Sequence, residues 1–359
     1  MAQSIYDMVT SEAIAAYYET LYSNEIPMIG ETLFPNRKKQ GLRLEWIKGY
    51  DSLPVALNPS AFDAKPPLRD RGNISIEQTE MPFFREAMRI GEYDRQQLLM
   101  FMESNQDSYA REIITRLFDD GTNLINGAKL IPEIMRCKLI TDGKFTIQSQ
   151  NTTGQNALYD YNYDPKGDWA SKNTITLSGT DKWSDHENSN PIADIMEVVR
   201  EAGRRGITIT RAIIGYDTWL DIVQNEKIRQ DMTITAIGAN NIIVTDNMVM
   251  SYITNKTGIS LQVYDKMYKD WSGDEQYFYP THGNITFLPA GTLGSTWYGT
   301  TPEEADLMSG NTDANVSIVN TGIAILTKKE ALPVNVITSV SEIVLPSFEN
   351  MNRVFNIKY

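Results

Sequence analysis

The sequence predicts an α+β fold, and three observations carry this prediction. Residues 107–139 have the apolar periodicity of one long amphipathic helix. Short runs on both sides of this stretch alternate apolar and polar residues, which is typical of β-strands. Residues 189–299 alternate helix and strand signals and predict an α/β module. A chain of 359 residues is long for one compact core, so we expect two domains or one domain with large extensions.

Residues 1–36 predict a short helix that ends before Pro27 and Pro35. The segment is either an arm that packs on something other than its own domain or an ordinary first helix. Residues 37–90 contain two strand-like runs, near residues 42–47 and 74–77, separated by a long tract rich in proline and charge. They predict a two-stranded ribbon that needs a covering partner surface, or a hairpin folded back on its own domain.

The long helix has an apolar stripe and a polar face. Gly121 and Gly127 weaken it, and Pro132 should kink or end it near Leu130, because proline removes a backbone donor. We expect Cys137 to be buried at its end. The stripe comprises Ala110, Ile113, Ile114, Leu117, Phe118, Gly121, Leu124, Ile125, Ala128, Ile131 and Met135; the polar face comprises Arg111, Glu112, Arg116, Asp119, Asp120, Asn123, Asn126, Lys129, Glu133 and Arg136.

Beyond the helix, residues 138–150, 157–165 and 173–183 predict three strands of an antiparallel sheet. Asn190 is a suitable N-cap and Pro191 a suitable first residue for a helix that ends near Gly203 or Gly206. From residue 300 onward, β-rich runs are interrupted by Pro333 and Pro346. These strands should return to the first sheet or cap the α/β module.

Composition narrows the classes of function. The net charge of −13 and pI near 4.8 argue against a nucleic-acid-binding protein, whose affinity depends on a basic surface. The single cysteine excludes an intrachain disulfide and favours a reducing compartment. No run of 18 apolar residues and no signal-peptide pattern occurs, so no membrane association is expected.

Catalytic signals are weak throughout the chain. The two histidines, His186 and His282, belong to no metalloprotease, nucleophile-elbow or phosphate-loop motif. Asp185 beside His186 is more typical of a solvated turn than of a catalytic relay. Asp119 and Asp120 are more typical of a solvated helix face than of an acid–base pair. The sequence therefore predicts no enzyme, no cofactor and no metal site.

The order of these segments resembles that of the lambda-type (E family) tailed-phage major capsid proteins. The likeness is carried by FFREAMRIGEY leading into the long helix, by DKWSDHENSNPIADIMEVVREA, by IIGYDTWLDI and by ITFLPAGTLGSTWYG, which together span roughly residues 80–345. The resemblance implies the Hong Kong 97-type capsid fold. Its parts would be an N-terminal arm (1–36), a β-ribbon called the E-loop (37–90), a peripheral domain with the spine helix (91–188 and 300–359) and an axial α/β domain (189–299).

The function that the resemblance implies is self-assembly into pentamers and hexamers of an icosahedral phage head enclosing packaged double-stranded DNA. The expected location is the virion, after assembly in the host bacterial cytoplasm. Expected partners are the chain itself, portal and scaffolding proteins, packaged DNA bound without sequence specificity and, as an open question, a decoration protein. An encapsulin-like compartment shell, a phage tail protein and an unrelated α/β enzyme remain alternatives.

Contacts between subunits would be made by aromatic and charged side chains of the arm, the E-loop and the spine helix. Arginines at the base of the E-loop would face carboxylates on the spine of the next subunit. The residues expected to make these contacts are Tyr17, Tyr18, Trp46, Pro54, Phe62, Arg69, Arg71, Asp119 and Asp120. A row of tyrosines, Tyr159, Tyr161 and Tyr163, would suit a further contact if it lies on one strand face at an edge.

Overall fold

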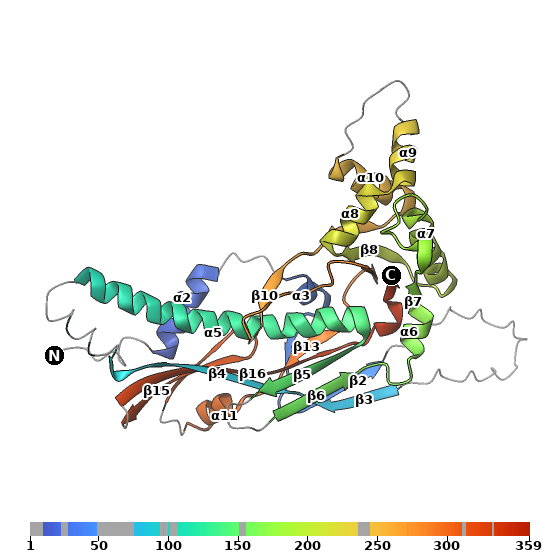
Figure 1. Cartoon of the computed structure of the whole chain (residues 1–359). Coiled ribbons are helices and arrows are strands. Elements are labelled where there is room, and N and C mark those ends of the chain that lie inside the picture. Colours follow the sequence, from blue (N-terminus) through green and yellow to red (C-terminus); the bar gives the residue numbers. More distant parts are fainter. Residues whose placement is uncertain are drawn as a thin grey trace, which may run out of the picture. The chain divides into compact units, whose positions relative to one another are not determined.

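The computed structural model describes residues 10–22, 28–48, 75–93, 96, 100, 107–150, 156–235, 245–270, 272–310, 314–331 and 334–359. The chain divides into two compact units (Figure 1). Unit 1 comprises Met1–Glu45, Gln78–Arg136 and Gly294–Ser347, and unit 2 comprises Trp46–Glu77, Cys137–Leu293 and Phe348–Tyr359. Each unit therefore combines segments that lie far apart in the sequence.

Unit 1 is built on a six-stranded sheet. Its long central strand is β16 (Val334–Ser347), which pairs with β13 (Ser295–Tyr298), β15 (Ile323–Ala331) and β4 (Phe83–Ile90), all antiparallel. β14 (Asn315–Val319) extends the sheet beyond β15, and β1 (Asn36–Lys38) runs parallel to β13. The β-rich runs that the sequence predicted from residue 300 onward correspond to β14, β15 and β16, whereas β1, β4 and β13 were not predicted. The break expected at Pro346 is wrong, because Pro346 lies within β16 opposite Thr296. The break expected at Pro333 lies outside the described residues.

Helices cover opposite faces of this sheet. Successive strand residues point to opposite faces, and Ser341 bonds Glu303 of α11 (Pro302–Ser309), whereas Arg136 of α5 (Asp107–Asp142) interacts with Glu342. In Figure 1 the part of α5 in unit 1 and α2 (Ser11–Tyr22) lie on one side of the strands, and α11 lies on the other. The sheet of unit 1 is thus the middle layer of three.

The helix α5 confirms the predicted long helix and extends to Asp142. The sequence predicted a kink or an end near Leu130; the end is wrong, since the helix continues through Pro132, and the kink stays a prediction. A mid-helix proline costs roughly 3 kcal/mol, and burial of apolar residues on both sides of Pro132 opposes this cost. Leu124, Ile125, Met135, Cys137 and Leu139 are all at most 5% exposed. Cys137 is buried as predicted.

Unit 2 contains a five-stranded sheet with the order β7 (Thr174–Thr176), β17 (Phe355–Lys358), β12 (Asn284–Pro289), β8 (Ile209–Ile214) and β9 (Ser260–Val263). Helices α7 (Pro191–Arg204), α8 (Tyr216–Gln224), α9 (Glu226–Thr235) and α10 (Asp246–Thr257) pack their apolar residues on it. Trp183 of this core is 0% exposed and donates its indole N–H to Asp194 at 2.8 Å.

The helix α7 begins as the sequence predicts. The Asn190 side chain accepts a hydrogen bond from the Ala193 N–H at 3.2 Å, and Pro191 is the first helical residue. Its buried face is formed by Ile195, Val198 and Ala202, whereas Met196 is 43% exposed.

The remaining described strands form three two-stranded ribbons. β2 (Arg43–Lys48) pairs with β3 (Ser75–Glu80), which confirms that the two predicted strand-like runs pair with each other. β5 (Lys144–Gln150) pairs with β6 (Asn156–Asn162), and β10 (Met267–Lys269) pairs with β11 (Glu275–Tyr277). The prediction that β7 joins β5 and β6 is wrong, because β7 pairs in parallel with β17.

Short helices link these elements: α3 (Ile29–Leu33), α6 (Asp168–Asn173) and two 3₁₀ turns, η1 (Gly179–Asp181) and η2 (Met351–Arg353). Within the described ranges, no helix is both long and apolar enough to cross a membrane. The boundaries predicted for the arm, the E-loop, the peripheral domain and the axial domain stay predictions.

One buried carboxyl stands out in unit 1. Glu342 is 0% exposed, and neither of its carboxyl oxygens has a hydrogen-bond partner among the described residues. Burial raises the pKa of Glu342 well above its usual range, and the nearby Arg136 opposes this shift only partly. Folding therefore favours the protonated form of this carboxyl.

We expect Glu342→Gln to stabilise the chain, and to do so more at pH 8 than at pH 5. The pKa of Glu342 is higher in the folded chain than in the unfolded chain. The wild-type chain therefore loses stability as the pH rises above the pKa of this carboxyl in the unfolded chain, by at most about 1.4 kcal/mol per pH unit. Urea unfolding of both chains at several pH values measures the difference. Glu86→Gln, at an exposed position of β4 on the same sheet face, should show no such trend. An equal effect of both substitutions would contradict the assignment.

Candidate subunit-contact surfaces

The N-terminal segment is joined to α5 by a buried polar cluster in unit 1. The Gly30 N–H donates to Glu133 Oε1 at 2.9 Å, and Glu133 faces Arg136 across 3.4 Å. The Arg136 guanidinium also donates to Asn36 Oδ1 at 2.6 Å and to Thr296 Oγ1 at 2.8 Å. Glu133 and Arg136 are 0% and 3% exposed. The sequence placed both on the solvated face of the helix, and that prediction is wrong.

Small residues allow the N-terminal elements to approach α5 closely. A Cβ atom on Gly30 would lie 2.5 Å from Glu133 Oε2, and one on Gly121 would lie 2.8 Å from Ile14 of α2. Ile14 is 0% exposed, and Ser11 at the start of α2 lies 3.1 Å from Ser317 of β14, measured between hydroxyl oxygens. Gly121, which weakens α5 by local propensity, thus makes room for α2.

The two arm tyrosines predicted to contact a neighbour lie against α5 of their own chain. The Tyr17 hydroxyl donates to Asp119 Oδ1 at 3.1 Å. Tyr18 is 3% exposed, and the Lys129 ammonium lies 5.4 Å from its ring centre. Burial, and then the charge of Asp119, raise the pKa of Asp120. A role of these four residues between subunits stays a prediction.

Trp46 is the one predicted E-loop contact residue that falls within the described residues. It is 8% exposed, and its ring stacks on Tyr163 with 5.1 Å between ring centres. The Lys48 ammonium donates to the Tyr163 carbonyl at 3.0 Å, so two residues of β2 hold the end of the β5–β6 ribbon. Pro54, Phe62, Arg69 and Arg71 lie outside the described residues.

The predicted tyrosine row belongs to this aromatic cluster of unit 2. Tyr161 and Tyr163 are each 7% exposed, and Tyr161 packs on Phe145 of β5 with 5.1 Å between ring centres. Tyr159 stacks on Tyr161 at 6.4 Å. Because two of the three rings are buried within the chain, the row contributes to packing inside unit 2.

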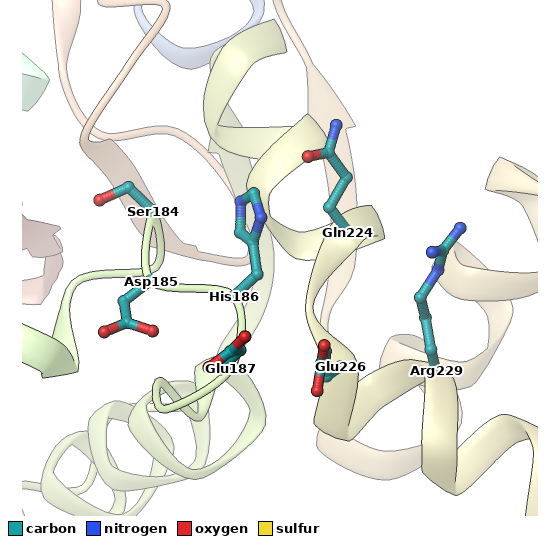
Figure 2. A pocket seen from close by; sticks show the side chains of 7 residues that line it. All are labelled: Ser184, Asp185, His186, Glu187, Gln224, Glu226 and Arg229. Atoms are coloured by element: carbon teal, nitrogen blue, oxygen red, sulfur yellow. The ribbon is translucent and has the colours of Figure 1, made fainter.

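Unit 2 also has an open surface hollow of about 780 Å³, here named the loop–α9 hollow. Figure 2 shows its lining side chains, which come from the loop before α7 and from the α8–α9 junction. They are Ser184, Asp185, His186, Glu187, Gln224, Glu226 and Arg229.

Both histidines contact one carboxylate next to this hollow. His186 Nε2 lies 3.1 Å from Asp221 Oδ1, and His282 Nε2 lies 3.3 Å from Asp221 Oδ2. The Tyr359 hydroxyl donates to the same Oδ2 at 2.8 Å. The imidazoles thus contact different oxygens of Asp221, and across the described ranges no group of three or more metal-ligating side chains is placed to hold an ion. The arrangement ties four segments of unit 2 together.

Solved structures share this architecture. A protein assigned as the capsid protein of a prophage of E. coli CFT073 aligns over 98% of this chain and 99% of its own, with 15% identity and a TM-score of 0.57. A phage-related protein of Bordetella bronchiseptica RB50 aligns over 95% of each chain, with 11% identity and a TM-score of 0.53. The fold is therefore the Hong Kong 97-type fold of phage capsid proteins, as the sequence predicted.

The sequence matches the family described as phage major capsid protein E over residues 10–340. This chain belongs to that family and is the major capsid protein of a phage head. The family is one of structural capsid proteins, and such proteins assemble into multimeric shells of the virion. A comparison with curated proteins found no match.

We expect Glu133→Ala to destabilise the chain by about 3–5 kcal/mol, because it leaves the buried Arg136 without its carboxylate partner. Amide exchange of residues 29–34 should rise at the same time, since the Gly30 N–H loses its acceptor. Urea unfolding and hydrogen–deuterium exchange measure the two effects. Lys138→Ala, at an exposed position of the same helix, should change stability by less than about 0.5 kcal/mol. If the two substitutions behave alike, the buried cluster does not anchor the N-terminal segment.

Proposed function

We propose that copies of this chain assemble into the pentamers and hexamers of an icosahedral head that holds packaged double-stranded DNA. The observation that carries the proposal is the family match over residues 10–340 of a chain with the capsid fold. The net charge of −13 supports a shell that encloses DNA without binding it tightly, because phosphate binding needs clustered basic residues. We expect no catalytic activity.

Assembly would use many weak, symmetric contacts. In this proposal the arm residues Tyr17 and Tyr18, the E-loop and the exposed carboxylates Asp119 and Asp120 contribute to contacts between neighbours, in addition to the contacts that Tyr17, Tyr18 and Asp119 make within their own chain. Portal and scaffolding proteins, and a decoration protein if the phage has one, would join during assembly in the host bacterial cytoplasm.

Electron microscopy of the purified chain, expressed alone and then with its neighbouring genes, tests the proposal. Closed or curved shells built from pentamers and hexamers support it. A uniform particle near the 40.6 kDa of one chain in both preparations would overturn it. Shells that contain a cargo enzyme and no DNA would instead indicate a compartment shell, and tubes would indicate a tail protein.

We expect removal of residues 51–71, replaced by a short glycine–serine linker, to leave a folded chain that cannot close shells. The reason is that contacts across subunits would be lost, whereas the packing of the described units would remain. Circular dichroism checks the fold, and electron microscopy checks the particles. Normal particles from the shortened chain would contradict the prediction that the E-loop makes contacts between subunits.

A charge exchange tests the predicted pairing within the same function. Arg69→Glu with Arg71→Glu should reduce shell formation, and adding Asp119→Lys with Asp120→Lys to that chain should restore it, because the signs on the two partner surfaces are reversed together. Failure of the second pair to restore assembly, in a chain that still folds, would contradict the pairing.

A further inference from the structure

The helix α7 exposes two arginines and a methionine to solvent. Met196, Arg200 and Arg204 follow one another at intervals of four residues and lie on one side of the helix. Met196 is 43% exposed, and the Arg204 side chain is 68% exposed. Arg204 pairs with Glu201 at the side of this face, whereas the Arg200 side chain makes no hydrogen bond or ion pair with the part of the chain that the structure describes.

This face cannot serve packing within unit 2, because the core lies on the opposite side of α7. Ile195, Val198 and Ala202 are at most 1% exposed and belong to the core of unit 2. Arginine and methionine are enriched in protein interfaces. Two arginines one helical turn apart lie beside Met196 on this surface, and the carboxylates of Glu197 and Glu201 flank them. Arg200 is the cation of this surface that has no carboxylate partner among the described residues.

The loop–α9 hollow carries the opposite charge. Asp185, Glu187 and Glu226 line it against one guanidinium, that of Arg229. Figure 2 shows Glu187 on the loop and Glu226 at the start of α9 on facing walls of the hollow. Glu187 and Glu226 are exposed and face solvent. Hydrogen bonds from Asn188 hold the pKa of Asp185 below its usual value, so this carboxylate stays ionised in mildly acidic solution.

We propose that the α7 face of one copy, defined by Met196, Arg200 and Arg204, docks against the loop–α9 hollow of a second copy. The argument is charge complementarity between two surfaces of the same unit, in a chain of a family whose members assemble with themselves. The inference rests on the proposed assembly function. It adds which surfaces of unit 2 meet.

Two different surfaces that fit each other produce heterologous contacts, which close into rings when the rotation between copies allows it. A pentamer or hexamer requires this kind of contact around its axis. Because both surfaces are exposed to solvent, the contact should weaken as salt screens the charges. Its main effects should be on specificity and on the rate of association.

Two oppositely charged variants of the full chain test the contact. One carries Arg200→Glu and Arg204→Glu, so that both of its surfaces are acidic; the other carries Glu187→Lys and Glu226→Lys, so that both are basic. Each variant alone should self-associate at least about tenfold more weakly than the wild type, since like charges then meet. An equal mixture should recover association, because each variant supplies the surface that the other lacks.

Sedimentation velocity at about 0.05 M and about 0.5 M salt, together with electron microscopy, gives the readouts, and thermal unfolding confirms that both variants fold. Lys166→Glu with Lys269→Glu, at exposed positions of unit 2, is the control of equal charge change and should associate like the wild type. Wild-type association by either single variant overturns the contact and leaves the capsid function intact. A mixture of folded variants that stays dissociated also overturns it. A wild-type chain that never associates overturns the assembly function and this contact together.

Discussion

The ion pair between Glu133 and Arg136 is the interaction on which the N-terminal half of unit 1 depends. The two charged side chains lie on a buried part of α5 and have lost their hydration, so each needs partners from the protein. Gly30, Asn36 and Thr296 supply these partners. Satisfying one buried pair thereby fixes the segment that contains α3 and β1 against α5 and aligns β1 with β13.

The strand β16 links Arg136 of α5 to the helix on the other side of the sheet. Its consecutive residues Ser341 and Glu342 point to opposite faces, one toward α11 and the other toward Arg136 of α5. On the Ser341 side, Glu303 accepts hydrogen bonds from Ser341 and from Arg85 of β4. On the other side, burial raises the pKa of Glu342, whose carboxyl oxygens have no hydrogen-bond partner among the described residues.

A capsid protein must be stable as a subunit and still adhesive toward its copies. In this chain the buried polar groups serve the first requirement, and exposed charges of both signs in unit 2 suit the second. Arg200 on α7 and two carboxylates of the loop–α9 hollow, Glu187 and Glu226, are exposed. The side of α7 that carries Arg200 does not pack on the core of unit 2. Exposed charged contacts are weak one by one, which suits a shell whose stability comes from many equivalent contacts.

The sequence by itself determined the features that depend on neighbouring residues: the long helix, the cap of α7 at Asn190, the β2–β3 ribbon and the order of segments that indicates the capsid family. Periodicity and capping are local, so a short window contains all the information they need. The tertiary structure alone decided that Glu133 and Arg136 are buried, that β7 joins β17, and that β16 continues through Pro346. Each of these depends on partners far along the chain: 103 residues separate Gly30 from Glu133, and 160 separate Arg136 from Thr296. No local pattern shows which charged residues of a helix will meet such partners, because burial is a property of the surface that packs against them.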